Sequence, residues 1–399
     1  MSTSVAAGRQ LAISARMAAW TGIVLGVLAA YVALPPLMVR SAFAPLLLAA
    51  AGVAAGVYAT REGERRLGWT AVAVAVLGGI CAVMAVKSGE GNLDRVFVWS
   101  ALTAGMLRYA TPLIFGAMGG ILSERSGVIN IGLEGMMLIG AFFGIFGSDL
   151  LGSWLLGILA GVAAGAVIGL VHAFVSIRLR ADQVVSGTGI NFLAIGITGY
   201  VFIYHYGDQG TPTDISRAPN VTLPLIEDIP FIGEAIGRMN VLTWVALLLV
   251  PILTVFLFRT RGGLRLRSVG EKPRAADSLG LPVLRTRYLA VTASGALAAA
   301  GGAFLSIGLV GSFNEQMTNG RGFIALAAVI FGGWRPVGAL AGALLFGFST
   351  ALAQRLPAFS ESTAVLFQAL PYVLTLVVVA GVIGRSRPPA AVGVPYVKE

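Results

Sequence analysis

The stretch SERSGVINIGLEGMMLIGAFFG, residues 123–144, places two polar side chains within an apolar run. If the run is helical, Asn130 and Glu134 are four residues apart and share one helix face. A carboxylate in hydrocarbon costs about 2.5–3.5 kcal/mol on insertion scales. We therefore expect Glu134 to have a compensating partner or to face a polar path, and Asn130 is the first candidate partner.

Apolar runs recur along the whole chain of 399 residues, which is 57% hydrophobic and 12% charged. An average soluble domain is about 25% charged, and a soluble protein could not bury this much apolar surface. The sequence therefore predicts an all-α, polytopic transmembrane helical bundle of about ten to twelve spans. The expected spans are 17–39, 42–59, 67–86, 98–122, 129–149, 153–177, 184–206, 240–258, 286–310, 322–354 and 363–384.

Two of these runs need separate comment. Because no soluble domain follows the first run, we expect it to be a membrane helix and not a cleaved signal peptide. The run 322–354 is too long for one crossing, and its centre, FGGWRPVG (331–338), contains helix-breaking residues. We expect two shorter helices or one broken helix there.

The net charge of +10 collects in short loops between apolar runs, which marks cytoplasmic loops and not a nucleic-acid surface. The loop 259–287 gives the strongest signal, with eight cations against Glu271 and Asp277. The acidic loop 207–238 belongs outside. This pattern predicts that the N-terminus and the C-terminus are both cytoplasmic.

The sequence argues against catalytic activity in this chain. None of the three lysines follows a glycine, so the phosphate-binding GxxxxGK[ST] loop is absent and we expect no ATP hydrolysis by this chain. One cysteine and two histidines provide neither metal-ligand spacing nor a catalytic grouping. We expect His172 and His205 to be packing or interfacial residues, with no metal site and no catalytic residue.

Small residues predict close helix packing. Gly157, Gly161, Gly165 and Gly169 form three overlapping GxxxG units on one face, which indicates a tight helix–helix seam. The stretches 126–140 and 321–335 also resemble each other faintly. The charge pattern gives them opposite directions, which suggests an inverted repeat of the kind found in transporter cores, although chance similarity explains it equally well.

The cytoplasmic loop contains GEKPRAADSLGL (270–281), which predicts a short amphipathic helix. Pro273 suits a first helical turn and Gly280 suits a helix end. A short helix on a charged loop is typical of a docking element, and an ordinary positively charged loop is the alternative.

Four stretches carry a resemblance to a known family. They are GEKPRAADSLGLPVLRTRYLAVTASGALAAAGGAFLSIG (270–308), NGRGFIALAAVIFGGWRPVGALAGALLFG (319–347), ERSGVINIGLEGMMLIGAF (124–142) and ADQVVSGTGINFLAIGITGYVF (181–202). The first two resemble importer permeases of the ATP-binding-cassette (ABC) class that serve simple sugars, nucleosides and branched-chain amino acids. The last two are most similar to the second permease of nucleoside importers fed by basic-membrane-protein-type lipoproteins.

The resemblance implies a division of labour in a bacterial plasma membrane. An extracytoplasmic substrate-binding lipoprotein catches the substrate, this chain and a second, related permease form the path through the lipid, and a cytoplasmic ABC ATPase binds ATP and Mg. The chain itself then needs no cofactor. The short helix becomes a coupling helix whose expected contacts with the ATPase are Glu271, Lys272, Arg274, Ala275, Ala276 and Gly280.

Polar groups within the membrane are candidates for the substrate path. We assign Asn130, Glu134, Asn191 and Asn314 to it, with Phe313 as a stacking surface for a base. For Glu134 a structural role, capping or pairing with a neighbouring helix, is an equal alternative. A neutral nucleoside needs no fixed charge, so direct contact between Glu134 and substrate is the less favoured form of the functional role.

The expected organisation has three parts: an N-terminal extension with about three spans (1–97), a permease core (98–384) with the coupling loop 259–287, and a cytoplasmic tail (385–399). The expected cargo is a nucleoside, and the alternatives are ribose-like sugars or branched-chain amino acids. A secondary transporter driven by an ion gradient, with Glu134 as a proton or sodium site, is a competing hypothesis from another class.

Overall fold

The computed structural model describes residues 14–34, 37, 39, 41–88, 98–355 and 387–397. Almost all secondary structure in these ranges is helical, which confirms the predicted all-α class. The chain divides into two compact units, one of residues 1–99 with 352–385 and one of residues 100–351 with 386–399. The predicted span 363–384 lies outside the described residues.

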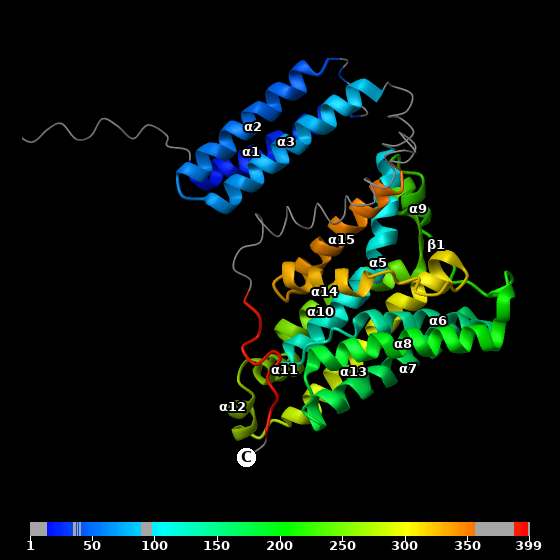
Figure 1. The fold of residues 1–399 in the computed structure, drawn as a ribbon. Helices are drawn as coiled ribbons and strands as arrows, with labels where there is room; N and C mark the ends of the chain where they lie inside the picture. The colour runs from blue at the N-terminus through cyan, green and yellow to red at the C-terminus, as the bar shows by residue number, and fades with distance from the viewer. Residues whose placement is uncertain are drawn as a thin grey trace, which may run out of the picture. The chain divides into compact units, whose positions relative to one another are not determined.

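The first unit contains α1 (Ala15–Ala33), α2 (Phe43–Arg61) and α3 (Arg65–Ser88), which correspond to the three predicted N-terminal spans. The three helices pack on one another through small residues (Figure 1). A Cβ added at Gly22 would lie 2.8 Å from the carbonyl oxygen of Gly52, and one added at Gly78 would lie 2.0 Å from that of Gly26. Such close approach explains why glycine occupies these positions.

The second unit holds the remaining helices and two short strands. They are α5 (Trp99–Arg125), α6 (Leu133–Leu151), α7 (Trp154–Ala173) with the π-helical turn η1 (Phe174–Arg178), α8 (Gln183–Tyr206), η2 (Gly207–Gln209), β1 (Asn220–Thr222), α9 (Pro224–Glu227), η3 (Gly233–Gly237), β2 (Arg238–Asn240), α10 (Val241–Arg259), α11 (Arg261–Glu271), α12 (Pro273–Ser278), α13 (Val283–Ala303) with η4 (Phe304–Val310), α14 (Arg321–Phe331) and α15 (Pro336–Ala353). The strands β1 and β2 pair antiparallel within the loop 207–240.

Nine helices in the described ranges are long and apolar enough to cross a membrane. The predicted break inside 322–354 is confirmed, because α14 ends at Phe331 and α15 begins at Pro336. Pro336 has no N–H to donate, and that is tolerated in a first helical turn.

The predicted glycine seam is confirmed on α7, which packs against α6 and α13 (Figure 1). A Cβ at Gly161 would lie 2.7 Å from the carbonyl oxygen of Gly140 on α6. A Cβ at Gly169 would lie 2.9 Å from that of Val291 on α13. The same face of α7 therefore serves two neighbours, one toward each end.

The predicted span 129–149 begins later than expected, because α6 starts at Leu133. Asn130 therefore precedes the helix, and the expectation that Asn130 and Glu134 share one helix face is wrong. We call residues 126–132 the α5–α6 connector. It has no regular secondary structure. The end of α5 bonds its first residues, and side chains of other helices bond its later ones.

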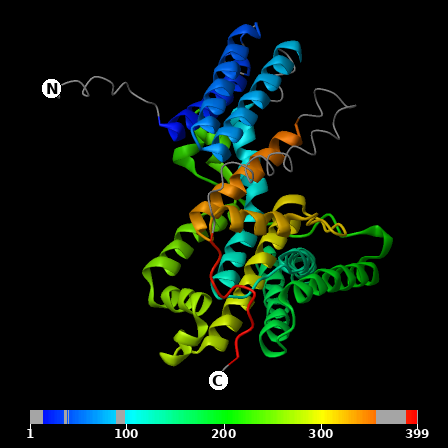
Figure 2. The same cartoon turned by 60° about the vertical axis from the view of Figure 1, so that its left-hand side comes forward.

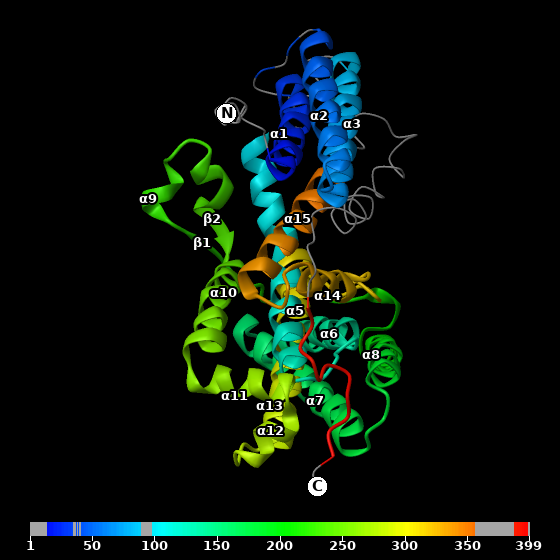
Figure 3. The ribbon, with the colours of Figure 1, turned by 90° about the vertical axis from the view of Figure 1, so that its left-hand side faces the viewer.

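The loop 259–287 is largely helical, and Figure 3 shows α10, α11 and α12 following one another into α13. The short helix predicted near residues 271–280 is confirmed as α12, with Pro273 in its first turn and Gly280 at a φ of +77° after its end. The preceding helix α11 is not anticipated by the sequence argument. It buries Leu266 and Val269 while its arginines stay at the surface or partly buried.

Candidate functional site

Glu134 lies in the first turn of α6, and its carboxylate is bound to the beginning of α14. Its Oε1 accepts the N–H of Gly320 at 2.8 Å, and its Oε2 accepts the N–H of Gly322 at 2.6 Å. Backbone N–H groups at a helix N-terminus have no partner within the helix and attract negative charge. The compensating partner that the sequence demands is therefore the N-terminus of α14 and not Asn130.

The approach at this junction requires a glycine. A Cβ added at Gly322 would lie 2.4 Å from the backbone nitrogen of Glu134. Close contacts also join α5 to its two neighbours. Gly116 and Gly120 of α5 lie against Ala325 and Val329 of α14, and also against Met137 and Leu133 of α6. The helices α6 and α14 therefore both pack against the same stretch of α5.

The far end of α14 is bound to the end of α5. The indole N–H of Trp334 donates to the carboxylate of Glu124, which is buried. The Nε of Arg125 donates to the carbonyl oxygen of Trp334 at 3.0 Å. Both ends of α14 are thus held by side chains from the segment 124–134.

Side chains from α7 and α8 satisfy the backbone of the α5–α6 connector. The N–H of Ile129 donates to Oε1 of Gln183 at 2.7 Å, and the carbonyl oxygen of Ile129 lies 3.0 Å from Nε2 of His172. Irregular backbone at membrane depth is tolerated only where such partners exist. His172 is buried and also bonds Ser186, which is the packing role predicted for it.

Asn191 of α8 links the connector to the first turn of α6. Its Nδ2 donates to the carbonyl oxygen of Ile131 at 3.2 Å, and its Oδ1 accepts the N–H of Gly135 at 2.8 Å. One side-chain amide thus provides hydrogen-bond partners for two backbone groups on either side of the start of α6. Its predicted place in the substrate path stays a prediction.

Asn130 is fully buried at the centre of the connector. Its Nδ2 donates to Oγ of Ser294 on α13 at 2.9 Å, and it lies 3.4 Å from Sδ of Met136. Within the described part of the chain, its Oδ1 has no hydrogen-bond partner. Asn130, Glu134 and Asn191 are therefore gathered around one connector, and each binds a different element.

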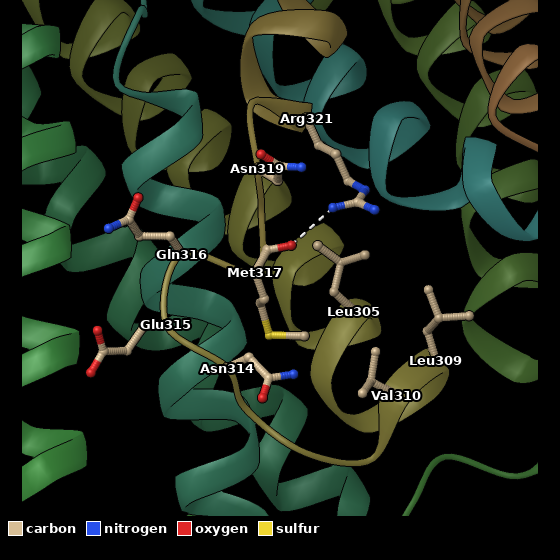
Figure 4. Close-up of a pocket in the computed structure, with 9 residues that line it drawn as sticks. All are labelled: Leu305, Leu309, Val310, Asn314, Glu315, Gln316, Met317, Asn319 and Arg321. Carbon is tan, nitrogen blue, oxygen red and sulfur yellow. Dashed lines mark hydrogen bonds between the residues drawn. The ribbon is translucent and has the colours of Figure 1, made fainter. Parts of the chain in front are cut away.

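A pocket of about 550 Å³ lies beside this junction, between η4 and the loop that leads to α14 (Figure 4). The apolar wall comes from η4, and the polar groups come from the loop and from Arg321, whose guanidinium donates to the carbonyl oxygen of Met317 at 2.9 Å. Asn314, one of the predicted path residues, lines it. The lining residues are Leu305, Leu309, Val310, Asn314, Glu315, Gln316, Met317, Asn319 and Arg321.

Phe313 lies away from this pocket, although it precedes Asn314. Only 2% of Phe313 is exposed. Its ring contacts Phe142 edge-on, with centroids 5.1 Å apart, and Phe202 at 5.3 Å. Protein side chains cover the ring in this structure, and its predicted role in stacking on a base stays a prediction.

The predicted coupling residues divide into outward-facing and inward-facing ones. Lys272, Arg274, Ala275 and Gly280 are exposed, whereas Ala276 is only 2% exposed and packs toward α11 and α13. Leu279, which was not among the predicted contacts, is 82% exposed. The contact between α12 and an ATPase stays a prediction, and Leu279 adds an exposed apolar side chain to the surface it would use.

A family model described as the permease component of branched-chain amino acid transport systems matches residues 102–379. The guanosine ABC transporter permease protein NupQ of Bacillus subtilis is 42% identical over 317 residues, which are 77% of this chain and 99% of NupQ. The nucleoside ABC transporter permease protein NupC of Lactococcus lactis is 41% identical over 74% of this chain and 96% of its own length.

The putative glucose ABC transporter permease protein TsgC13 of Haloferax volcanii is 40% identical over 64% of this chain and 78% of its own length. Further guanosine and nucleoside permeases match at 26% and 24% identity. No solved structure matches the chain.

The helical bundle, its broken helices and these matches define a multi-pass membrane permease. The chain belongs to the family of permease components of branched-chain amino acid transport systems. The family resemblance that the sequence motifs carry is thereby confirmed.

Proposed function

We propose that this chain is a permease subunit of an ATP-driven importer and forms part of the membrane path for nucleosides. Two relatives support this cargo, because both are at least 41% identical and are described as guanosine or nucleoside permeases. Import of sugars is the alternative, because a relative at 40% identity is described as a putative glucose permease.

The geometric observation that carries the proposal is α12. It lies in the most cation-rich loop, keeps Ala276 buried against the protein, and leaves Leu279 and several charged side chains exposed. A self-contained secondary transporter needs no such surface. The absence of the GxxxxGK[ST] pattern means that ATP and Mg would be bound by a cytoplasmic ABC ATPase docked at α12.

The remaining partners follow from the same division of labour. A second, related permease would complete the path, and an extracytoplasmic lipoprotein would deliver the substrate. The described tail residues 387–397 contact the loop that contains α12, so the C-terminus would be cytoplasmic together with that loop. The three predicted spans before residue 98 would place the N-terminus on the same side.

In this scheme the pocket beside α14 is a substrate-binding site along the path. Its amide and charged groups suit a neutral, polar ligand with several hydroxyl groups, and its wall from η4 gives an apolar surface. Glu134 then acts as a brace that fixes α14 and does not need to touch the substrate.

The test is reconstitution of the chain with its partner permease, ATPase and lipoprotein in proteoliposomes. We expect uptake of labelled guanosine that requires ATP on the cytoplasmic face of the transporter. Guanosine should stimulate ATP hydrolysis, whereas glucose and leucine should not. Stimulation by glucose alone would replace the cargo. Uptake by the chain alone on a proton or sodium gradient would overturn the proposal.

A further inference from the structure

The described tail residues, 387–397, lie against the coupling loop 259–287, and we call them the C-terminal strap. The N–H of Ala391 donates to the carbonyl oxygen of Gly270 at 2.9 Å, and the N–H of Gly393 donates to that of Gly127 at 3.2 Å. The tail, drawn in red in Figure 2, thus bonds to the end of α11 and also to the α5–α6 connector. These two elements are far apart in sequence.

Arg287, in the first turns of α13, binds both the connector and the tail. It is only 1% exposed. Its Nε donates to the carbonyl oxygen of Ser126 at 3.1 Å, and its Nη1 donates to that of Val394 at 3.1 Å. Nη2 of Arg287 has no hydrogen-bond partner among the described residues, so losing either of these bonds would leave a second buried charged donor unpaired.

The tail also supports α12 directly. Tyr396 is buried with Val269, Ala276 and Val283, so its ring lies on the inward side of α12. Oε2 of Glu271 accepts the N–H of Ala390 at 3.2 Å. Glu271 therefore has a partner within the chain, which changes how its predicted contact with the ATPase must be tested.

The contact between the loop and the connector is too close to absorb a displacement. A Cβ at Gly270 would lie 2.1 Å from the carbonyl oxygen of Arg125 and 3.2 Å from the nitrogen of Gly127. Close-packed interiors transmit displacement and do not deform continuously. From Gly127 the connector leads, in seven residues of chain, to Glu134 and the N-terminus of α14.

We propose that the C-terminal strap is a positioning element that binds α12 to the α5–α6 connector, so that displacement of the coupling helix reaches the junction between Glu134 and α14. Tyr396 and Arg287 are its positioning residues. The proposal rests on the proposed function for the source of the displacement, whereas the mechanical link is a property of this chain alone.

The test compares Tyr396→Ala, Tyr396→Phe and the exposed neighbour variant Val397→Ala in the full-length chain in lipid nanodiscs. Hydrogen exchange should rise at least tenfold in Tyr396→Ala at two places together, residues 273–278 and residues 127–131. Tyr396→Phe keeps the packed ring and should remain near wild type, as should Val397→Ala. A rise limited to 273–278, or no rise, would overturn the link.

A second readout uses the reconstituted transporter. Tyr396→Ala should keep ATP hydrolysis but lower the substrate imported per ATP at least fivefold. If Tyr396→Ala does not assemble, Ala390→Pro decides, because it removes the N–H donated to Glu271 at an exposed position, besides fixing φ there, and should lower the same ratio about twofold. An unchanged ratio in Ala390→Pro would then overturn the proposal.

Failure of the proposed function is distinguishable from failure of the strap. A wild-type complex without ATP-dependent uptake would refute the importer, while the exchange experiment would still decide whether the tail links α12 to the connector. Coupled exchange at both segments in such a protein would support the strap, and uncoupled exchange would overturn it.

Discussion

The carboxylate of Glu134 binds the backbone N–H of Gly322 at 2.6 Å, across 188 residues of sequence. The pair joins the first turn of α6 to the first turn of α14. A charge that would be costly in lipid thus becomes an N-terminal cap for a short helix. The helix dipole and two N–H groups supply the compensation.

Replacing Glu134 separates a bracing role from a role in the path. We expect Glu134→Ala to lower the free energy of unfolding by about 1–3 kcal/mol, because two partly buried N–H groups lose their acceptor. Glu134→Gln keeps one acceptor oxygen and should lose less. Thermal unfolding in detergent measures both changes. A Glu134→Gln protein as stable as wild type yet inactive in uptake would contradict the brace and indicate a substrate, proton or sodium contact.

Gly322→Ala should be far more harmful than an ordinary helix substitution. The new Cβ would lie 2.4 Å from the backbone nitrogen of Glu134, so α6 and α14 must separate. We expect a loss of more than about 2 kcal/mol, within the range of overpacking. Gly189→Ala is the matched control, because nothing lies within 4 Å of its added Cβ and alanine favours the helix. Equal melting temperatures for the two variants would refute the close approach.

Asn191 is predicted to act through both ends of its amide. Asn191→Leu removes the donor to Ile131 and the acceptor for Gly135, so we expect a loss of about 1–3 kcal/mol. Asn191→Asp keeps the acceptor but sets a carboxylate oxygen against the carbonyl of Ile131, and it should also destabilise. Thermal unfolding together with uptake kinetics distinguishes this structural role from a path role, for which the Michaelis constant would rise without a change in stability.

The exposed side of α12 gives a prediction for docking. Leu279→Glu should leave folding unchanged, because the side chain is 82% exposed, but should abolish co-purification of the ATPase. Leu264→Glu, 58% exposed on α11, is the control and should retain the ATPase. Normal assembly of Leu279→Glu would remove α12 from the interface.

The predicted coupling pair needs its own comparison, because Glu271 also binds the tail. Arg274→Ala should uncouple hydrolysis from transport, so that less substrate is imported per ATP hydrolysed. Glu271→Gln keeps an acceptor for the N–H of Ala390, so any loss of coupling in this variant reports on the charge. Unchanged coupling in both variants would contradict their assignment to the ATPase contact.

Asn314 is the predicted path residue that lines the pocket beside α14. We expect Asn314→Ala to raise the Michaelis constant for uptake about three- to tenfold, because one or two hydrogen bonds to the substrate would be lost. The melting temperature should not fall. Gln209→Ala, at an exposed position away from the pocket, should have no effect. Wild-type kinetics in Asn314→Ala would remove this residue from the path.

Composition and periodicity alone determined that this chain is a helical membrane protein with its positive charge concentrated in the loop 259–287. They also determined the break near Pro336, the glycine seam of α7 and the short helix α12. These features are local, because run length, charge and helix-breaking residues act over a few turns. The family motifs added the permease class.

Only the tertiary structure decided what the polar residues bind. The start of α6 at Leu133, the capping of α14 by Glu134, the support of the connector by Gln183 and the strap that ends near Tyr396 all join segments far apart in sequence. Hydrogen-bond partners of this kind depend on which helices become neighbours, and a one-dimensional pattern does not specify that. The sequence marked Glu134 as a charge in need of compensation, and packing between α6 and α14 supplied it.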